Sequence, residues 1–126
     1  MAKEVLFREE TYELIGACIE VHREKGPGFL EQVYHECLML EAKNRKVLLT
    51  SKPKLEIFYK GAPLQQRYEP DFVGFSKIIL EIKAVKALED SHRAQTINYL
   101  KATGFRLALL VNFGSQGCLE WERFVN

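Results

Sequence analysis

The sequence predicts an α/β protein in which helices flank a mixed β-sheet, with the element order α-α-β-β-β-α-β-β. Two amphipathic segments come first, and the second half holds two apolar segments typical of buried strands, with a helical segment between them. A strand, a helix and a second strand in succession form a right-handed crossover, which makes the two strands parallel. The 126 residues are enough to bury one core, so residues 1–126 are expected to form a single domain.

Composition and charge are those of an ordinary globular protein. The chain is 47% hydrophobic and 28% charged, with a net charge of +1. It therefore lacks the overall basic excess of a non-specific DNA-binding protein, and any nucleic-acid-binding surface must be local. No apolar leader or long apolar run is visible, which predicts a cytoplasmic protein that does not bind membranes. The three cysteines are far apart and are expected to be free thiols: Cys18, Cys37 and Cys118.

Two helices are expected in the first third of the chain. The first runs from Glu9 to about Lys25, where apolar residues recur at helical spacing, and Gly26-Pro27-Gly28 ends it. His22 lies on this apolar stripe and is interpreted as a core-edge histidine rather than a metal ligand. The second helix runs from about Leu30 to Arg45. The apolar positions expected on the buried sides are Leu14, Ile15, Cys18, Ile19, Leu30, Val33, Tyr34, Cys37 and Leu38.

Three strands are expected next. The segment Pro53–Tyr59 alternates, with Leu55, Ile57 and Tyr59 on one face, and Lys60-Gly61 turns the chain. The segments Gln66–Val73 and Ile78–Val85 then form a central hairpin across the turn 74–77.

The last elements are a helix and two strands. The helix runs from His92 to Thr103, with Asp90 or Ser91 as its N-terminal cap and Gly104 after its end. A buried strand, Arg106–Asn112, follows it, and Leu119–Val125 closes the chain as an edge strand. The helix residues expected to face the core are Ala94, Ile97 and Leu100.

The central hairpin carries charges where a buried strand seldom does. Glu81 and Lys83 interrupt an apolar run and point to the same face, and the hairpin brings Asp71 roughly opposite Glu81. Two adjacent carboxylates repel each other, and a divalent cation between them removes that repulsion. A lysine on the same face can hold a phosphate oxygen or the attacking water. The pattern therefore favours metal-assisted phosphodiester hydrolysis.

Simpler interpretations exist for each of these features taken alone. A Glu-x-Lys pattern is common on exposed strands, where the ion pair contributes little, and Pro-Asp is a common turn dipeptide. Glu31, in the first turn of the second helix, is by pattern alone best explained by its interaction with the helix dipole. The combination of Asp71, Glu81 and Lys83 at hairpin spacing on an apolar strand favours the functional interpretation.

These residues resemble the PD-(D/E)XK nuclease superfamily, whose restriction-endonuclease-like core is a mixed sheet flanked by helices. The segment Gly28-Phe29-Leu30-Glu31-Gln32-Val33-Tyr34 is similar to the signature of the GxxExxY family within it. The resemblance implies that Glu31, Asp71 and Glu81 bind the metal, together with the backbone carbonyl of Ile82. It implies that Lys83 positions the attacking water. Gln95, with Tyr99 four residues on, resembles a Gln-x-x-x-Tyr helix that reaches the site or the nucleic-acid backbone.

The first hypothesis is therefore a nuclease dependent on Mg²⁺ (or Mn²⁺) that cleaves DNA or RNA by attack of metal-activated water. The alternative is a catalytically silent module that binds nucleic acid or protein, and a third interpretation is a metal site that only stabilises the fold. A homodimer would suit cleavage of both strands of a duplex. Tyr99, Lys86 and Arg93 are the candidate nucleic-acid contacts, and further cations that could follow a phosphate backbone are Lys52, Lys54 and Lys101.

Overall fold

The structure is a computed structural model that describes residues 5–126. Residues 1–4 of the expected single domain lie outside the described part. Two helices are followed by five strands, a third helix and two more strands: α1 (Arg8–Lys25), α2 (Glu31–Arg45), β1 (Leu49–Ser51), β2 (Leu55–Tyr59), β3 (Ala62–Tyr68), β4 (Phe72–Gly74), β5 (Ile78–Lys83), α3 (Asp90–Thr103), β6 (Leu107–Asn112) and β7 (Glu120–Val125). The predicted fold class is confirmed, although five strands and not three precede α3. None of the helices described is long and apolar enough to cross a membrane.

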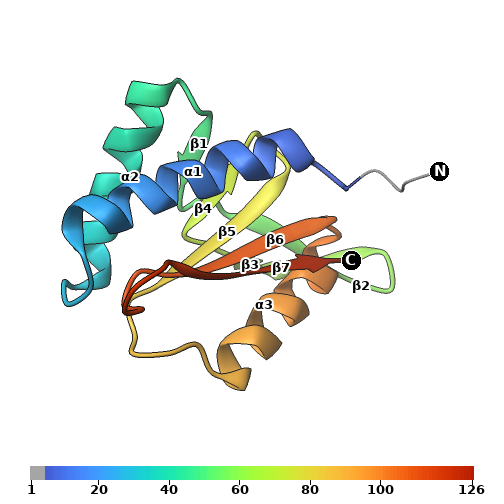
Figure 1. Cartoon of the computed structure of the whole chain (residues 1–126). Coiled ribbons are helices and arrows are strands. Elements are labelled where there is room, and N and C mark those ends of the chain that lie inside the picture. Colours follow the sequence, from blue (N-terminus) through green and yellow to red (C-terminus); the bar gives the residue numbers. More distant parts are fainter. Residues whose placement is uncertain (1–4) are drawn as a thin grey trace.

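The sheet has five strands in the order β1-β4-β5-β6-β7, and helices cover both of its faces (Figure 1). Strands β5 and β6 are parallel, as the predicted crossover requires, whereas the other neighbours are antiparallel. Alternation along β5 divides the core: Ile78, Leu80 and Ile82 pack with the residues of α1 and α2. Ile79 packs instead with Leu100 of α3. Glu81, two residues after Ile79, therefore faces the α3 side of the sheet.

The predicted strand Gln66–Val73 is wrong, because the structure divides this segment into β3 and β4. Pro70 lies between the two and has no backbone N–H to donate to a sheet. Strand β3 pairs with β2 in a separate two-stranded sheet, while β4 pairs with β5. The turn joining β4 to β5 is as expected, and Phe75 and Ser76 adopt the positive φ angles of 53° and 62° that a tight hairpin turn demands.

Several expectations about helix ends and faces were also wrong. Leu30 caps α2 with extended backbone and is 73% exposed, and Ile19 is 49% exposed, so neither belongs to the core. Tyr59 and Ala94 are exposed as well. The cap of α3 is Glu89, whose side chain accepts the His92 backbone N–H while the His92 ring accepts the Glu89 N–H. Short capping side chains are the usual signal, which is why Asp90 or Ser91 was expected instead.

A buried asparagine joins the end of β5 to the turn between β6 and β7. Asn112 Oδ1 accepts hydrogen bonds from the backbone N–H groups of Val85 and Gly114, both at 3.0 Å. Its Nδ2 donates to Glu120 Oε1 at 3.0 Å. The turn lies so close that a Cβ atom on Gly114 would be 2.1 Å from the Val85 carbonyl oxygen. The predicted strand Ile78–Val85 therefore ends at Lys83, and the Val85 N–H bonds to the Asn112 side chain instead of a neighbouring strand backbone.

His22 is where the sequence predicted it. Its side chain is 7% exposed at the edge of the core, and Nε2 lies 2.9 Å from the Ser115 carbonyl oxygen. The interpretation of His22 as a satisfied structural histidine is confirmed.

Candidate active site

Asp71 and Glu81 lie side by side, as the hairpin predicted. The antiparallel register pairs Phe72 with Leu80, which places the preceding residue, Asp71, beside Glu81. The Asp71 backbone N–H donates to Glu81 Oε1 at 2.7 Å, and the Ile82 N–H donates to Asp71 Oδ2 at 2.8 Å. Each carboxylate is thus oriented by a backbone amide close to the other.

Tyr68, at the end of β3, contacts the second oxygen of Glu81. Its hydroxyl donates to Glu81 Oε2 at 2.6 Å. The Tyr68 ring stacks on Tyr99 of α3, with centroids 4.0 Å apart and planes 5° from parallel. Sequence reasoning gave Tyr68 no role; its position three residues before Asp71 was the available signal. Tyr99 thus lies behind Glu81 through Tyr68, and its expected contact with nucleic acid stays a prediction.

The carboxylates of this site strongly affect one another. Burial, and secondly the negative charge of Asp71, raise the pKa of Glu81 to about 7. The same two causes raise the pKa of Glu31 above its usual range, while the positive charges of Lys83 and Lys52 oppose that rise. Glu31 therefore lies within electrostatic reach of Asp71 and Lys83, although α2 and β5 are far apart in sequence.

A cavity of about 560 Å³ opens beside Asp71, and its lining residues are Glu31, Gln32, His35, Glu36, Lys52 and Asp71. His35, one helical turn after Glu31, stacks on Phe72 with ring centroids 4.1 Å apart. Its Nε2 lies 2.8 Å from Ser51 Oγ, and burial lowers its pKa. Sequence reasoning missed His35, for which the i, i+4 spacing from Glu31 was the only signal.

The remaining predicted site residues are less closely gathered. Lys83, at the end of β5, and Ile82 belong to the same strand as Glu81, whereas Gln95 and Lys86 are exposed. Arg93 bonds to Glu122 at 2.6 Å and to Asp90 at 3.1 Å. Binding nucleic acid through Arg93 would thus compete with these two salt bridges.

The donors at this site suit a hard divalent cation but are not arranged as a complete metal shell. Within residues 5–126, no group of three or more His, Cys, Asp or Glu side chains is placed to hold a metal ion. Carboxylate and carbonyl oxygens are nevertheless the ligands that Mg²⁺ and Mn²⁺ prefer. Burial, and secondly the charge of Asp71, raise the pKa values of Glu31 and Glu81, and a cation beside them would favour their charged forms. The chemistry of these oxygen donors therefore suits such a cation.

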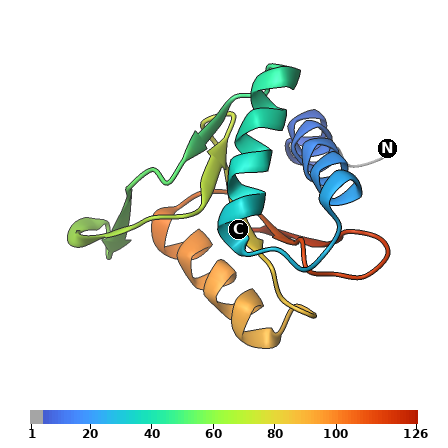
Figure 2. The same ribbon diagram turned by 90° about the vertical axis from the view of Figure 1, so that its left-hand side faces the viewer.

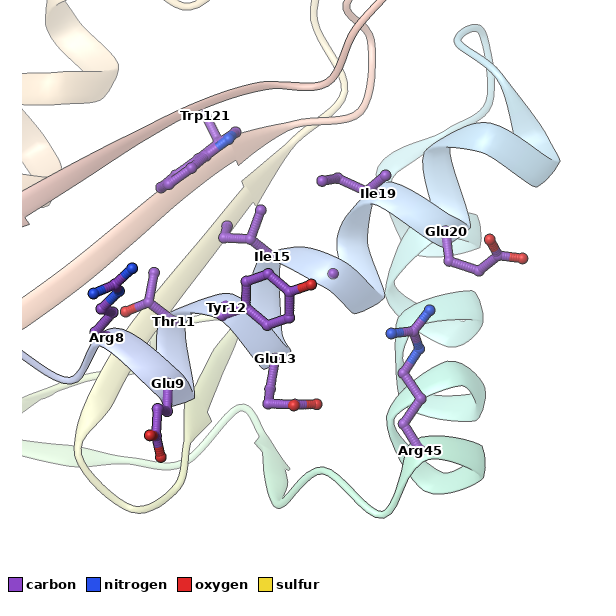
Figure 3. A pocket seen from close by; sticks show the side chains of 11 residues that line it. Arg8, Glu9, Thr11, Tyr12, Glu13, Ile15, Ile19, Glu20, Arg45 and Trp121 are labelled. Carbon is purple, nitrogen blue, oxygen red and sulfur yellow. The ribbon is translucent and has the colours of Figure 1, made fainter.

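A larger cavity, of about 840 Å³, lies along α1 and is separate from this site (Figure 3). Ile15 and Ile19 of α1 and Trp121 of β7 line it, together with Arg45 from the end of α2. None of the predicted site residues borders it. Its size alone therefore does not make it the functional site, because the titratable groups with raised pKa values gather elsewhere.

Comparisons with known proteins identify the superfamily and the fold. A family model described as the PD-(D/E)XK nuclease superfamily matches residues 8–124. The crystal structure of SSO0001 superimposes with a TM-score of 0.53 at 18% sequence identity, over 75% of this chain and 50% of that one. At this identity the likeness concerns the fold alone, and the chain spans half the length of SSO0001. No curated protein matches.

Proposed function

The chain belongs to the PD-(D/E)XK nuclease superfamily, and we propose that it is a metal-dependent nuclease that hydrolyses phosphodiester bonds in nucleic acids. The observation that carries the proposal is the coupled pair of Asp71 and Glu81, held together by the Asp71 and Ile82 backbone amides. A buried carboxylate with a raised pKa, Glu81, lies beside a second carboxylate and on the same strand as a lysine, and this arrangement supports a chemical use.

Within the superfamily we assign the chain to the GxxExxY family. Gly28 has a φ angle of 111°, which disfavours other residues, in the turn before α2. Tyr34 is fully buried, and its hydroxyl donates to the Gly26 carbonyl at 2.6 Å and accepts the Phe29 N–H at 3.2 Å. The motif thereby fixes the turn and the start of α2, which supports a role for Glu31 at the Asp71 cavity.

Mg²⁺ or Mn²⁺ would be held by Glu31, Asp71, Glu81 and the carbonyl of Ile82. When bound, the cation would neutralise the carboxylates and lower the pKa of a water molecule. Lys83 places a positive charge where the transition state gains negative charge, and it orients the attacking water. Tyr68 fixes one Glu81 oxygen, which limits the rotation of that carboxylate. Gln95, Tyr99, Lys86 and Arg93 extend the site toward the nucleic-acid backbone.

The first experiment is Mn²⁺ titration by calorimetry, followed by incubation with labelled DNA and RNA. Saturable binding and cleavage are expected for the wild type, with both lost in Asp71→Ala. Glu13→Ala is the control, since Glu13 is an exposed carboxylate on α1. Equal cleavage by Asp71→Ala and the wild type would refute the proposal.

A second candidate function is a catalytically silent module that binds nucleic acid or protein. It is favoured by one observation: both oxygens of Glu81 are already engaged, by Tyr68 and Asp71. The silent module predicts no turnover with any divalent metal, together with nucleic-acid binding that survives Lys83→Ala. Turnover that is lost in Lys83→Ala would exclude it.

A further inference from the structure

The segment 52–68 forms an exposed β-hairpin that projects from the rest of the molecule (Figure 2). We call this segment the hairpin arm. Its inner half packs against α3, where Leu55 and Ile57 join the cluster around Leu100. Every residue from Phe58 to Arg67 is exposed. The outer half of the arm therefore contributes little to the core, and its side chains are free to contact another molecule.

The arm concentrates the positive charge of an otherwise slightly acidic protein. It holds four cations and one carboxylate, so its net charge is +3, whereas the whole chain has +1 and the other residues together have −2. The cations are Lys52, Lys54, Lys60 and Arg67. Within residues 5–126 these four form no salt bridge, in contrast to Arg23, Arg45, Lys77 and Arg93. Unpaired cations on one projecting element favour a polyanion as the partner.

Aromatic side chains lie among these cations. Phe58 is 43% exposed and Tyr59 is 63% exposed. Lys60 Nζ lies 5.4 Å from the centroid of the Tyr59 ring. Exposed rings beside cations are the features with which proteins stack unpaired bases and hold the phosphates between them. A duplex offers no free base faces, so this combination favours a single strand.

Both ends of the arm reach the candidate active site. Leu55 and Tyr68 are register partners, and Tyr68 bonds to Glu81. At the other end of the arm, before β2, the Lys52 backbone N–H donates to the Asp71 carbonyl oxygen at 2.9 Å. A strand bound along the arm would thus end at Asp71 and Glu81.

We propose that the hairpin arm binds single-stranded nucleic acid and leads the strand to the Asp71–Glu81 site. The inference deepens the proposed nuclease function and rests on it for the direction in which the strand runs. Binding by the arm itself needs neither the metal nor catalysis.

The test is fluorescence anisotropy with labelled oligo(dT) and oligo(U) in EDTA, where no hydrolysis occurs. The first variant is Lys54→Ala/Lys60→Ala/Arg67→Ala, which keeps both strands of the arm intact. The control is Arg8→Ala/Lys25→Ala/Lys43→Ala, which removes the same charge from α1 and α2. Circular dichroism and the Tm of each variant check that the fold is unchanged.

The arm variant is expected to bind at least about tenfold more weakly, and its slope of log K against log salt is expected to be about 2 units shallower. The control is expected to lose less than about threefold, because its charges lie on α1 and α2 and not on the arm. Tyr59→Ala should weaken binding about fivefold or more through lost stacking. Comparing the affinities for oligo(dT) and oligo(U) shows whether DNA or RNA is preferred.

Equal binding by the arm variant and the control would overturn the inference, as would failure of the wild type to bind either oligonucleotide. The nuclease proposal has a separate readout, which is metal-dependent cleavage. Equal cleavage rates for the wild type and the arm variant, at substrate concentrations below saturation, would refute strand binding by the hairpin arm. The proposed nuclease function would still stand. If binding depends on the arm but no cleavage occurs, the proposed nuclease function would be refuted. Strand binding by the hairpin arm would still stand.

Discussion

Glu81 should make the protein less stable as the pH rises from about 4.5 to about 7. Burial and the nearby Asp71 charge raise the pKa of Glu81 from 4.5 to about 7. Between these values the folded protein keeps a proton on Glu81 that the unfolded chain has released. Raising the pH therefore favours the unfolded chain across this window, and the effect levels off above it.

The magnitude follows from the size of the pKa change. Each pKa unit corresponds to about 1.4 kcal/mol, so Glu81 should cost on the order of 3 kcal/mol between the two ends of the window. Glu81→Gln stays neutral at every pH and keeps the geometry. Its oxygen can accept the Asp71 N–H, and its amide group can donate to the Tyr68 hydroxyl. The difference in the free energy of unfolding between Glu81→Gln and the wild type should thus rise by about 3 kcal/mol, in favour of the variant, from the low-pH to the high-pH end of the window.

The measurement is urea denaturation at several pH values, followed through the single Trp121 and through circular dichroism. Glu13→Gln is the matched control, because Glu13 is exposed on α1 and should leave the pH dependence of the wild type unchanged. A constant difference between Glu81→Gln and the wild type from pH 4.5 upward would refute the reasoning, since it would mean that Glu81 titrates alike in the folded and unfolded states.

Two further substitutions test contacts around the site. Tyr68→Phe removes the hydroxyl that donates to Glu81 at 2.6 Å and should lower the free energy of unfolding by about 1–3 kcal/mol above pH 7, where the carboxylate is charged. The loss should be smaller near pH 4.5, and equal losses at both pH values in urea denaturation would contradict this account. Gly114→Ala should cost about 2 kcal/mol or more, because the new Cβ atom would meet the Val85 carbonyl at 2.1 Å. In thermal unfolding, the control Gly16→Ala should instead stabilise α1, since its Cβ would meet only the flexible end of Arg45, at 3.4 Å.

The fold could be predicted where local pattern and burial agree. The apolar segments that form β5 and β6 precede and follow α3 in the sequence. Their parallel pairing follows from this chain connectivity alone. The division of Gln66–Val73 into two strands in different sheets could not be predicted in this way. It depends on which partner each half finds, and the alternation of side chains on a half-exposed strand does not identify that partner.

In the candidate site, too, some features could be predicted from local sequence and others depend on tertiary contacts. The neighbouring positions of Asp71 and Glu81 follow from a short hairpin turn, so a local signal was sufficient. The Tyr68 hydrogen bond to Glu81 and the cavity lining of His35 arise from segments that meet only in the folded chain. The hairpin arm was missed for another reason: a net charge of +1 for the whole chain conceals a basic element balanced by acidic helices.

Asn112 has a consequence for how the site can move. Its hydrogen bonds hold the Val85 amide to the β6–β7 turn, and the Phe113 N–H also donates to the Lys83 carbonyl at 2.7 Å. The backbone at and after Lys83 is therefore held by Asn112 of β6 and by Phe113 in the β6–β7 turn. Residues 83–85, at the end of β5, should therefore move together with the β6–β7 turn as one rigid unit.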